Sequence, residues 1–388
     1  MVSYRDLVPE YIRSLRRYTP GKPLRQAEQE SGVRCIKLAS NENPFGPSPN
    51  AIIAMQAALR ECHLYPENES DALRHNLARH HGLMPEHVLV TAGSTAMLGI
   101  VGRTLLRPGL NAITSEHSFI MYPIVTRAAG GQMIAVPTKN SGFDLDGIAA
   151  AINSETRIVF LANPNNPTGT AFDAITFDRF LAKVPNWVTL VLDEAYSDFA
   201  ECFGRERGME YSRSIDHVRS GRNVVVLRTF SKAHGLAGLR VGYGLGPREL
   251  MDYFSRLRTI FSVSAVAQSA ALAATTDVRH INKTLGNNMQ GAKLLSSELS
   301  RMGYKVVPTW ANFVYIELGE DASAVAMRLQ SEGILIRPLG PWGLPTAIRI
   351  TIGTIQQNER FLAAFSRIIT RSPFLKRRGT RLPLGSRR

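Results

Sequence analysis

Short apolar runs alternate with helix-like segments along the first two thirds of the chain. Six of these runs have the uninterrupted apolar character of buried strands. They are HVLVTAG (87–93), AITSE (112–116), QMIAVP (132–137), RIVFLAN (157–163), WVTLVLD (187–193) and NVVVLRTF (223–230). Helical stretches separate most of them, such as STAMLGIVGRTLL (94–106), which starts with the good capping residues Ser94 and Thr95. This alternation predicts an α/β fold with a mostly parallel sheet covered by helices on both faces.

The pattern changes after about residue 270, where helices and strands come in runs. A long helical stretch over 265–301 precedes the strand-like segments YKVVP, NFVYIEL, ILIRPL and AIRITIG, with a helix near 321–332 and a last helix to about 370. Such runs are typical of a smaller α+β domain. Near the N-terminus, a short helical piece is followed by YTPGKP and CIKLASNENPFGPSP, where Pro and Gly are expected to break any regular element.

Length and charge refine this division. A chain of 388 residues is too long for one core. We predict an arm over 1–45, a large domain over 46–270, a small domain over 271–370 and a tail over 371–388. The net charge is +14, and the tail holds seven basic residues and no acidic one. We expect the tail to be disordered and solvated, and nucleic-acid binding is not favoured because charge alone supports it.

The remaining composition points to the cytoplasm. The N-terminus lacks the apolar core of a secretory signal, and no run of about 18 apolar residues predicts a membrane span. Cys35, Cys62 and Cys202 are widely spaced, which indicates reduced thiols. No metal site is expected either. Histidines cluster over 63–87, but their spacing lacks a ligand pattern, and a solvated helix face is favoured.

The chemistry-bearing residues follow the predicted strands, at the sheet edge where α/β proteins bind ligands. Gly93, Ser94 and Thr95 open a helix, and free N–H groups at a helix start suit a phosphate. Thr229, Ser231 and Arg240 could complete that site. Asp193 ends one run and Lys232 follows another. A buried carboxylate needs a cationic partner, and a desolvated lysine is nucleophilic. A phosphate site, a carboxylate and a lysine together suit pyridoxal phosphate.

The chain resembles the fold-type-I pyridoxal-phosphate aminotransferases, and within them the histidinol-phosphate aminotransferase family. Five motifs carry the resemblance, in the family's order. They are LASNENPFGPSP (38–49), NPNNPTG (163–169), LDEAYSDF (192–199), TFSKAHGLAGLRVGYG (229–244) and GLPTAIRITIGT (343–354). The resemblance covers roughly residues 15–365 and implies a homodimeric enzyme that uses an amino donor and 2-oxoglutarate.

The resemblance also implies a role for each matching residue. Lys232 attaches the cofactor and transfers the proton, Asp193 pairs with the ring nitrogen, and Asn166 and Tyr196 bond the ring oxygen. Tyr122 is expected to stack on the ring. The expected phosphate ligands are Ser94, Thr95, Thr229, Ser231 and Arg240, joined by Tyr65 from the neighbouring subunit. The expected substrate-binding residues are Arg349, which clamps the anionic end, and Arg337 and Tyr18, which contact the substrate phosphate.

Two departures from the family pattern bear on the substrate. Trp342 stands where tyrosine is usual, and the segment 258–264 differs from the family's sequence. His117 stands where proline is usual, which is expected to shift its loop slightly. An aromatic-amino-acid aminotransferase therefore stays open as an alternative, and a threonine-phosphate decarboxylase ranks third. A non-catalytic DNA-binding relative of the same fold has only the positive charge in its favour.

Overall fold

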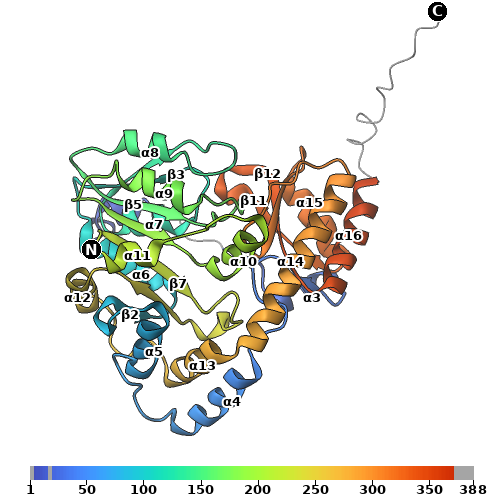
Figure 1. The fold of residues 1–388 in the computed structure, drawn as a ribbon. Coiled ribbons are helices and arrows are strands. Elements are labelled where there is room, and N and C mark those ends of the chain that lie inside the picture. Colours follow the sequence, from blue (N-terminus) through green and yellow to red (C-terminus); the bar gives the residue numbers. More distant parts are fainter. Residues whose placement is uncertain (1–3, 16–19, 371–388) are drawn as a thin grey trace, which may run out of the picture.

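The computed structural model describes residues 4–15 and 20–370, and Figure 1 shows its arrangement. A seven-stranded sheet forms its centre, in the order β2-β8-β7-β6-β5-β3-β4. Five neighbouring strands, from β7 to β4, run parallel, whereas β8 is antiparallel to both of its neighbours. The strands are β2 (Val88–Thr91), β3 (Asn111–Ser115), β4 (Gln132–Val136), β5 (Thr156–Ala162), β6 (Thr189–Asp193), β7 (Val224–Thr229) and β8 (Gly242–Leu245).

Helices cover both faces of this sheet because its strands are apolar on both sides. On β7, Val224 and Val226 face one hydrophobic cluster, and Val225 and Leu227 face another. Each fully buried side chain of this size contributes roughly 1.5–3 kcal/mol. The helices of this part are α4 (Pro49–Ala58), α5 (Asp71–His81), α6 (Ser94–Leu105), α7 (Met121–Ala128), α8 (Leu145–Ala151), α9 (Ala174–Leu181), α10 (Ser197–Arg207), α11 (Ser214–Arg219), α12 (Arg248–Arg256) and α13 (Ala265–Thr276), with 3-10 turns η1 (Leu59–Glu61), η2 (Pro85–His87) and η3 (Ala237–Leu239).

The C-terminal part is built on a three-stranded antiparallel sheet, in the order β11-β12-β9. Its strands bury apolar side chains such as Val314, Ile316 and Ile348 with residues of the C-terminal helices in one cluster. The elements are α14 (Val278–Arg301), β9 (Phe313–Glu317), α15 (Ala322–Ser331), β10 (Ile334–Leu335), β11 (Arg337–Leu339), η4 (Gly340–Trp342), β12 (Leu344–Thr351) and α16 (Ile355–Thr370). The prediction of helices mixed with a few strands is confirmed here.

Several details differ from the sequence-based expectations. The helical stretch over 265–301 is two helices, because Asp277 has a non-helical backbone and its side chain caps α14. In YKVVP, Val306 makes only an isolated bridge to Ile316. The expected arm contains α1 (Tyr4–Leu7), α2 (Glu10–Arg13) and α3 (Leu24–Ser31), and β1 (Ile36–Lys37) pairs in parallel with β10 despite the nearby prolines. Within the described residues no helix is long and apolar enough to cross a membrane.

One histidine of the 63–87 cluster also departs from its prediction. His81 does not lie on a solvated helix face but is buried, and its Nε2 is 3.0 Å from the hydroxyl of Tyr243 on β8. Burial lowers the pKa of His81 to about 2, helped by the nearby charge of Arg228. His81 therefore joins α5 to the central sheet as a neutral side chain.

Candidate active site

A cavity of about 260 Å³ lies where the parallel strands end and α6 begins. Figure 1 shows this edge of the sheet turned toward the C-terminal strands β11 and β12. Strands β5, β6 and β7 each contribute the side chain at their carboxyl end, which is the usual position of a ligand site in this architecture. The side chains that line it are those of Ser40, Glu42, Ser94, Thr95, Phe119, Ala162, Pro164, Asn166, Asp193, Ala195, Tyr196, Thr229, Ser231, Lys232, Ala237 and Arg240.

Hydroxyl groups and an arginine gather at one end of this cavity. Ser94 and Thr95 occupy the first turn of α6, and Thr229 and Ser231 follow from β7. The Nη1 of Arg240 donates to the Ser231 hydroxyl at 3.2 Å. The helix is capped by Gly93 at φ 84°, and a Cβ built there would lie 2.6 Å from Nη2 of Arg240. The arginine therefore crosses directly over a backbone that only glycine leaves open.

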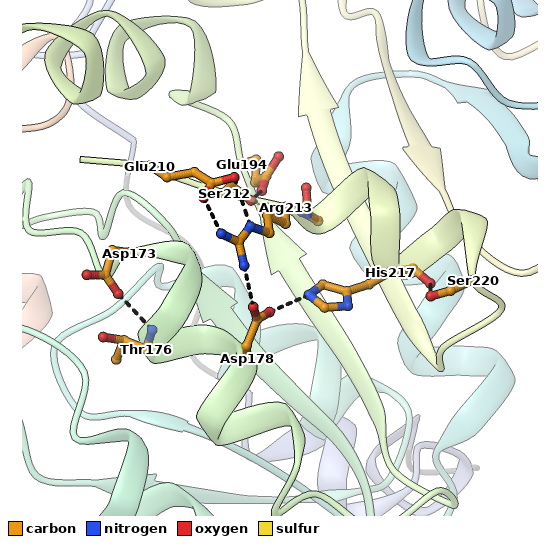
Figure 2. Close-up of polar contacts among 10 residues, drawn as sticks. Asp173, Thr176, Asp178, Glu194, Glu210, Ser212, Arg213, His217 and Ser220 are labelled. Carbon is orange, nitrogen blue, oxygen red and sulfur yellow. Dashed lines mark hydrogen bonds and ion pairs between the residues drawn. The ribbon is translucent and has the colours of Figure 1, made fainter. Parts of the chain in front are cut away.

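Two neighbouring carboxylates at the end of β6 have opposite surroundings. Glu194 is buried and forms an ion pair with Arg228 at 2.8 Å, and its other oxygen accepts from the Ser212 hydroxyl at 2.7 Å. Figure 2 shows Glu194 at the edge of a polar network in which Arg213 lies between Glu210 and Asp178. None of these residues lines the cavity.

Asp193 instead faces the cavity and is 5% exposed. It accepts hydrogen bonds from the Tyr122 hydroxyl at 3.1 Å and the Ala195 N–H at 3.2 Å. Among the described residues, no basic nitrogen lies within 4 Å of it. Burial raises the pKa of Asp193 to about 6, although the Tyr122 hydrogen bond opposes this. A buried carboxylate without an adjacent cation is suited to a cationic ligand group.

Lys232 enters the same cavity just beyond the end of β7. Its Nζ donates to the carbonyl of Ser40 at 3.3 Å and lies 5.6 Å from the centre of the Tyr196 ring. Burial, and after it the positive charge of Arg349, lowers the pKa of Lys232 to about 8. Near neutral pH a larger fraction of this amine is therefore uncharged, and able to act as a nucleophile, than for an ordinary lysine.

Asn166 and Tyr196 line the wall between Asp193 and the C-terminal sheet. The Asn166 Oδ1 accepts from the guanidinium of Arg349, which also donates to the Ala39 carbonyl at 2.9 Å. The Tyr196 hydroxyl accepts from Nδ2 of Asn41 at 2.8 Å. These contacts join the cavity to β12 and to the segment that follows β1.

The structure differs from the prediction at Tyr122. Its ring is fully buried, 4.9 Å from Phe160 and nearly parallel to it, so no face is open to the cavity. Phe119, three residues earlier and just before α7, lines the cavity instead. The reason is that α7 begins at Met121, which turns Tyr122 into the core beneath Asp193. Ser40 and Glu42 also line the cavity; they belong to the quoted motif LASNENPFGPSP, but no role was assigned to them.

The remaining predicted residues do not line the cavity of this single chain. Arg337 lies opposite Arg349 on the neighbouring strand, and both are buried. Tyr65 is 84% exposed and stacks on Phe261, with ring centres 4.8 Å apart. Tyr18 lies outside the described residues.

Comparison with known proteins decides the family. Residues 33–365 match the family described as aminotransferase class I and II. The chain belongs to this family. This aminotransferase is 42% identical to histidinol-phosphate aminotransferase 2 of Pseudomonas fluorescens, over 93% of its own length and 97% of that protein. It is 41% identical to histidinol-phosphate aminotransferase of Moorella thermoacetica, over 93% of its own length and 92% of that protein.

Solved structures agree with this assignment. Histidinol-phosphate aminotransferase from Sinorhizobium meliloti, in complex with pyridoxal-5'-phosphate, superposes with a TM-score of 0.85 at 30% identity. The match covers 94% of this aminotransferase and 98% of that chain. Aspartate aminotransferase from Thermus thermophilus with maleate has the same fold, with a TM-score of 0.78 at 22% identity and coverage of 93% and 99%. The predicted fold class and the resemblance to the family are confirmed.

Family membership implies that this aminotransferase depends on pyridoxal phosphate. The cavity fits that group in three independent ways. Asp193 supplies a buried carboxylate with no cation adjacent among the described residues. Arg240 and the first turn of α6 supply anion-binding groups over a glycine. Lys232 supplies a desolvated amine between them.

Proposed function

We propose that this aminotransferase transfers the amino group of L-histidinol phosphate to 2-oxoglutarate, giving imidazole-acetol phosphate and L-glutamate. The observation that carries the proposal is the pair of buried arginines beside the cavity. Arg337 and Arg349 are directly opposite on β11 and β12 and are only 9% and 5% exposed. Like charges opposite each other repel, so the pair favours a ligand with two negative charges, such as a phosphate ester. The names of the relatives support the same substrate.

The residues of the cavity divide the chemistry among them. We assign the cofactor phosphate to Ser94, Thr95, Thr229, Ser231 and Arg240, and the ring oxygen to Asn166 and Tyr196. The Asp193 carboxylate would hold a proton on the ring nitrogen, and Phe119 would take the role expected of Tyr122 from the sequence. When bound, pyridoxal phosphate supplies an electron-withdrawing ring that makes the Cα proton of the amino donor acidic.

Lys232 is the group that moves this proton. With the cofactor bound, its uncharged amine would accept the Cα proton of the amino donor and later donate it, a positioned acid–base step worth about 10²–10⁴-fold in rate. Arg349 serves both half-reactions, because a guanidinium can bind the phosphate of one substrate and a carboxylate of the other. We expect Tyr65 to reach the phosphate of a neighbouring subunit, so the complete site requires a homodimer.

A visible-absorbance titration of the purified holoenzyme tests the substrate. We expect L-histidinol phosphate to bleach the coloured enzyme at low concentration without a keto acid, and phenylalanine to require much more. A coloured protein that ignores histidinol phosphate but responds to phenylalanine would replace the proposal with an aromatic-amino-acid aminotransferase. Release of CO₂ in place of glutamate formation would indicate the threonine-phosphate decarboxylase reaction.

A further inference from the structure

Trp342 lies against both arginines of the proposed anion site. The carbon centre of the Arg337 guanidinium is 5.2 Å from the indole ring centre, and that of Arg349 is 5.8 Å away. The indole is buried, with 8% of its surface exposed. An aromatic face attracts a guanidinium, so one ring here offsets the mutual repulsion of two cross-strand charges and fixes where they lie.

The turn that carries Trp342 is held by a loop of the central sheet. Trp342 ends the single 3-10 turn η4, between β11 and β12. Its carbonyl oxygen lies 2.8 Å from Nδ1 of His117, in the loop that follows β3. Because a carbonyl only accepts, Nδ1 carries the proton and donates. The imidazole also packs on the turn itself, since a Cβ added at Gly343 would lie 3.5 Å from Cε1 of His117.

His117 is in turn held by the loop that reaches the cofactor cavity. Nδ2 of Asn165 donates to the backbone carbonyl of His117 at 2.9 Å. The next residue, Asn166, lines the cavity and accepts from Arg349. The contacts therefore run from Arg349 through Asn166, Asn165 and His117 to Trp342, and the indole of Trp342 contacts Arg349 again. Each member is fixed by its neighbours on both sides.

We propose that His117 and Trp342 form a positioning pair that holds Arg337 and Arg349 in the geometry of a dianion site and so selects a phosphate ester over a monocarboxylate. This inference rests on the proposed function for the location of the site. Neither residue lines the cofactor cavity. Both act through the arginines. If His117 or Trp342 is replaced, the two guanidinium groups are expected to move apart. A dianion needs both groups and should then bind more weakly, whereas a monocarboxylate needs only Arg349 and should be affected less.

Two substitutions of Trp342 distinguish a role of the aromatic ring face from a role of the indole N–H group. Among the described residues Nε1 of Trp342 has no acceptor, although it is buried. Trp342→Phe removes this donor and keeps an aromatic face, whereas Trp342→Leu keeps an apolar side chain and removes the face. At position 117, Asn places an amide nitrogen near the site of Nδ1, whereas Gln places it near Nε2. Asn is therefore expected to restore the bond to η4, and Gln is not.

The test measures inorganic phosphate as a competitive inhibitor of the holoenzyme, against whichever amino donor the wild type turns over. We expect His117→Gln and Trp342→Leu to raise the inhibition constant about tenfold. His117→Asn and Trp342→Phe should stay within about threefold of the wild type. His75→Ala and Trp187→Phe are matched controls, because both side chains are exposed and remote from the cavity lining. The kcat and the melting temperature, measured in parallel, should change little.

The outcomes are distinct from those of the substrate test. An inhibition constant that is the same in all variants overturns the positioning pair, and so does a wild type that phosphate does not inhibit. A fall in kcat and stability with no selective loss of phosphate binding assigns the residues a merely structural role and also overturns it. If the wild type does not react with histidinol phosphate, the proposed function is wrong. The phosphate-inhibition measurement still tests the positioning role of His117 and Trp342 in that case.

Discussion

At the scale of single residues, the adjacent carboxylates Asp193 and Glu194 show how burial without a partner prepares a site. Glu194 forms an ion pair with Arg228, whereas Asp193 accepts only two hydrogen bonds from uncharged groups. Asp193 has a pKa of about 6, raised from 3.8. The carboxyl group of Asp193 thus binds its proton more tightly in the folded protein than in the unfolded chain. Stability contributed by that proton is present below pH 4 and is lost as the pH rises through about 6, a loss on the order of 2–3 kcal/mol.

Asp193→Asn should therefore stabilise the cofactor-free protein at about pH 8. We expect a gain of about 1–2 kcal/mol, because the amide never ionises but gives up part of one hydrogen bond. Near pH 4 the two proteins should unfold alike. Urea unfolding at both pH values measures this difference. Glu194→Gln is the matched control and should be destabilised by about 1–3 kcal/mol, because Arg228 loses its ion pair at 2.8 Å and keeps only Glu201 at 3.7 Å. A destabilised Asp193→Asn at pH 8 would contradict the argument.

At the scale of elements, the start of α6 depends on one glycine. A Cβ at Gly93 would meet Arg240 at 2.6 Å, and the φ of 84° disfavours any other residue. Gly93→Ala should displace Arg240 and weaken pyridoxal-phosphate binding by about tenfold or more, roughly the loss of one charge-assisted hydrogen bond. Cofactor affinity of the apoprotein, measured by absorbance titration, checks this.

Gly99→Ala, on the same helix, is the control for that substitution. Nothing lies within 4 Å of a Cβ built there. It should leave cofactor affinity unchanged and stabilise the helix by about 0.5–1 kcal/mol. Equal cofactor affinity in Gly93→Ala and Gly99→Ala would show that Arg240 does not need the glycine.

Elements are also where prediction from sequence succeeded and failed. The apolar runs that became β5, β6 and β7 were recognised because strands buried on both faces need no polar alternation. Strand β8 was missed, because its sequence Gly-Tyr-Gly-Leu is not an apolar run and its glycines let neighbours approach closely. The sequence pointed to Tyr122 and not to Phe119, because the residue at which α7 begins decides which ring reaches the cavity, and the sequence does not fix that residue. The division into domains stays a prediction.

At the scale of the whole molecule, exposed apolar side chains flank the stacked rings of Tyr65 and Phe261 in the sequence. Tyr65 and Phe261 are themselves exposed, and so are Leu59, Leu64, Leu257 and Ile260. Exposed large apolar side chains of this kind suit an interface with another subunit.

Ile260→Asp should disrupt the proposed homodimer. Ile260 is 70% exposed, so in the isolated chain the change should cost little stability, but in an interface it buries a charge. Light scattering after size-exclusion chromatography should show a monomer with much reduced activity. Met327→Asp is the control, since Met327 is 65% exposed on α15. A monomeric wild type, or a variant that stays dimeric, would remove the dimer from the proposal.

Mixing two impaired variants tests whether the subunits share their sites. Tyr65→Ala should lose the phosphate contact that we assign to the partner's site, and Lys232→Ala loses the reacting amine. In a mixed dimer the Tyr65→Ala chain supplies the lysine and the Lys232→Ala chain supplies the tyrosine, so one site of the two is complete. Random exchange makes half of the dimers mixed, so about one quarter of the wild-type activity should return. Activity that merely averages the two variants would place Tyr65 in its own subunit's site or outside both sites. The recovery also depends on dimer exchange, so Ile260→Asp introduced into both chains should abolish it.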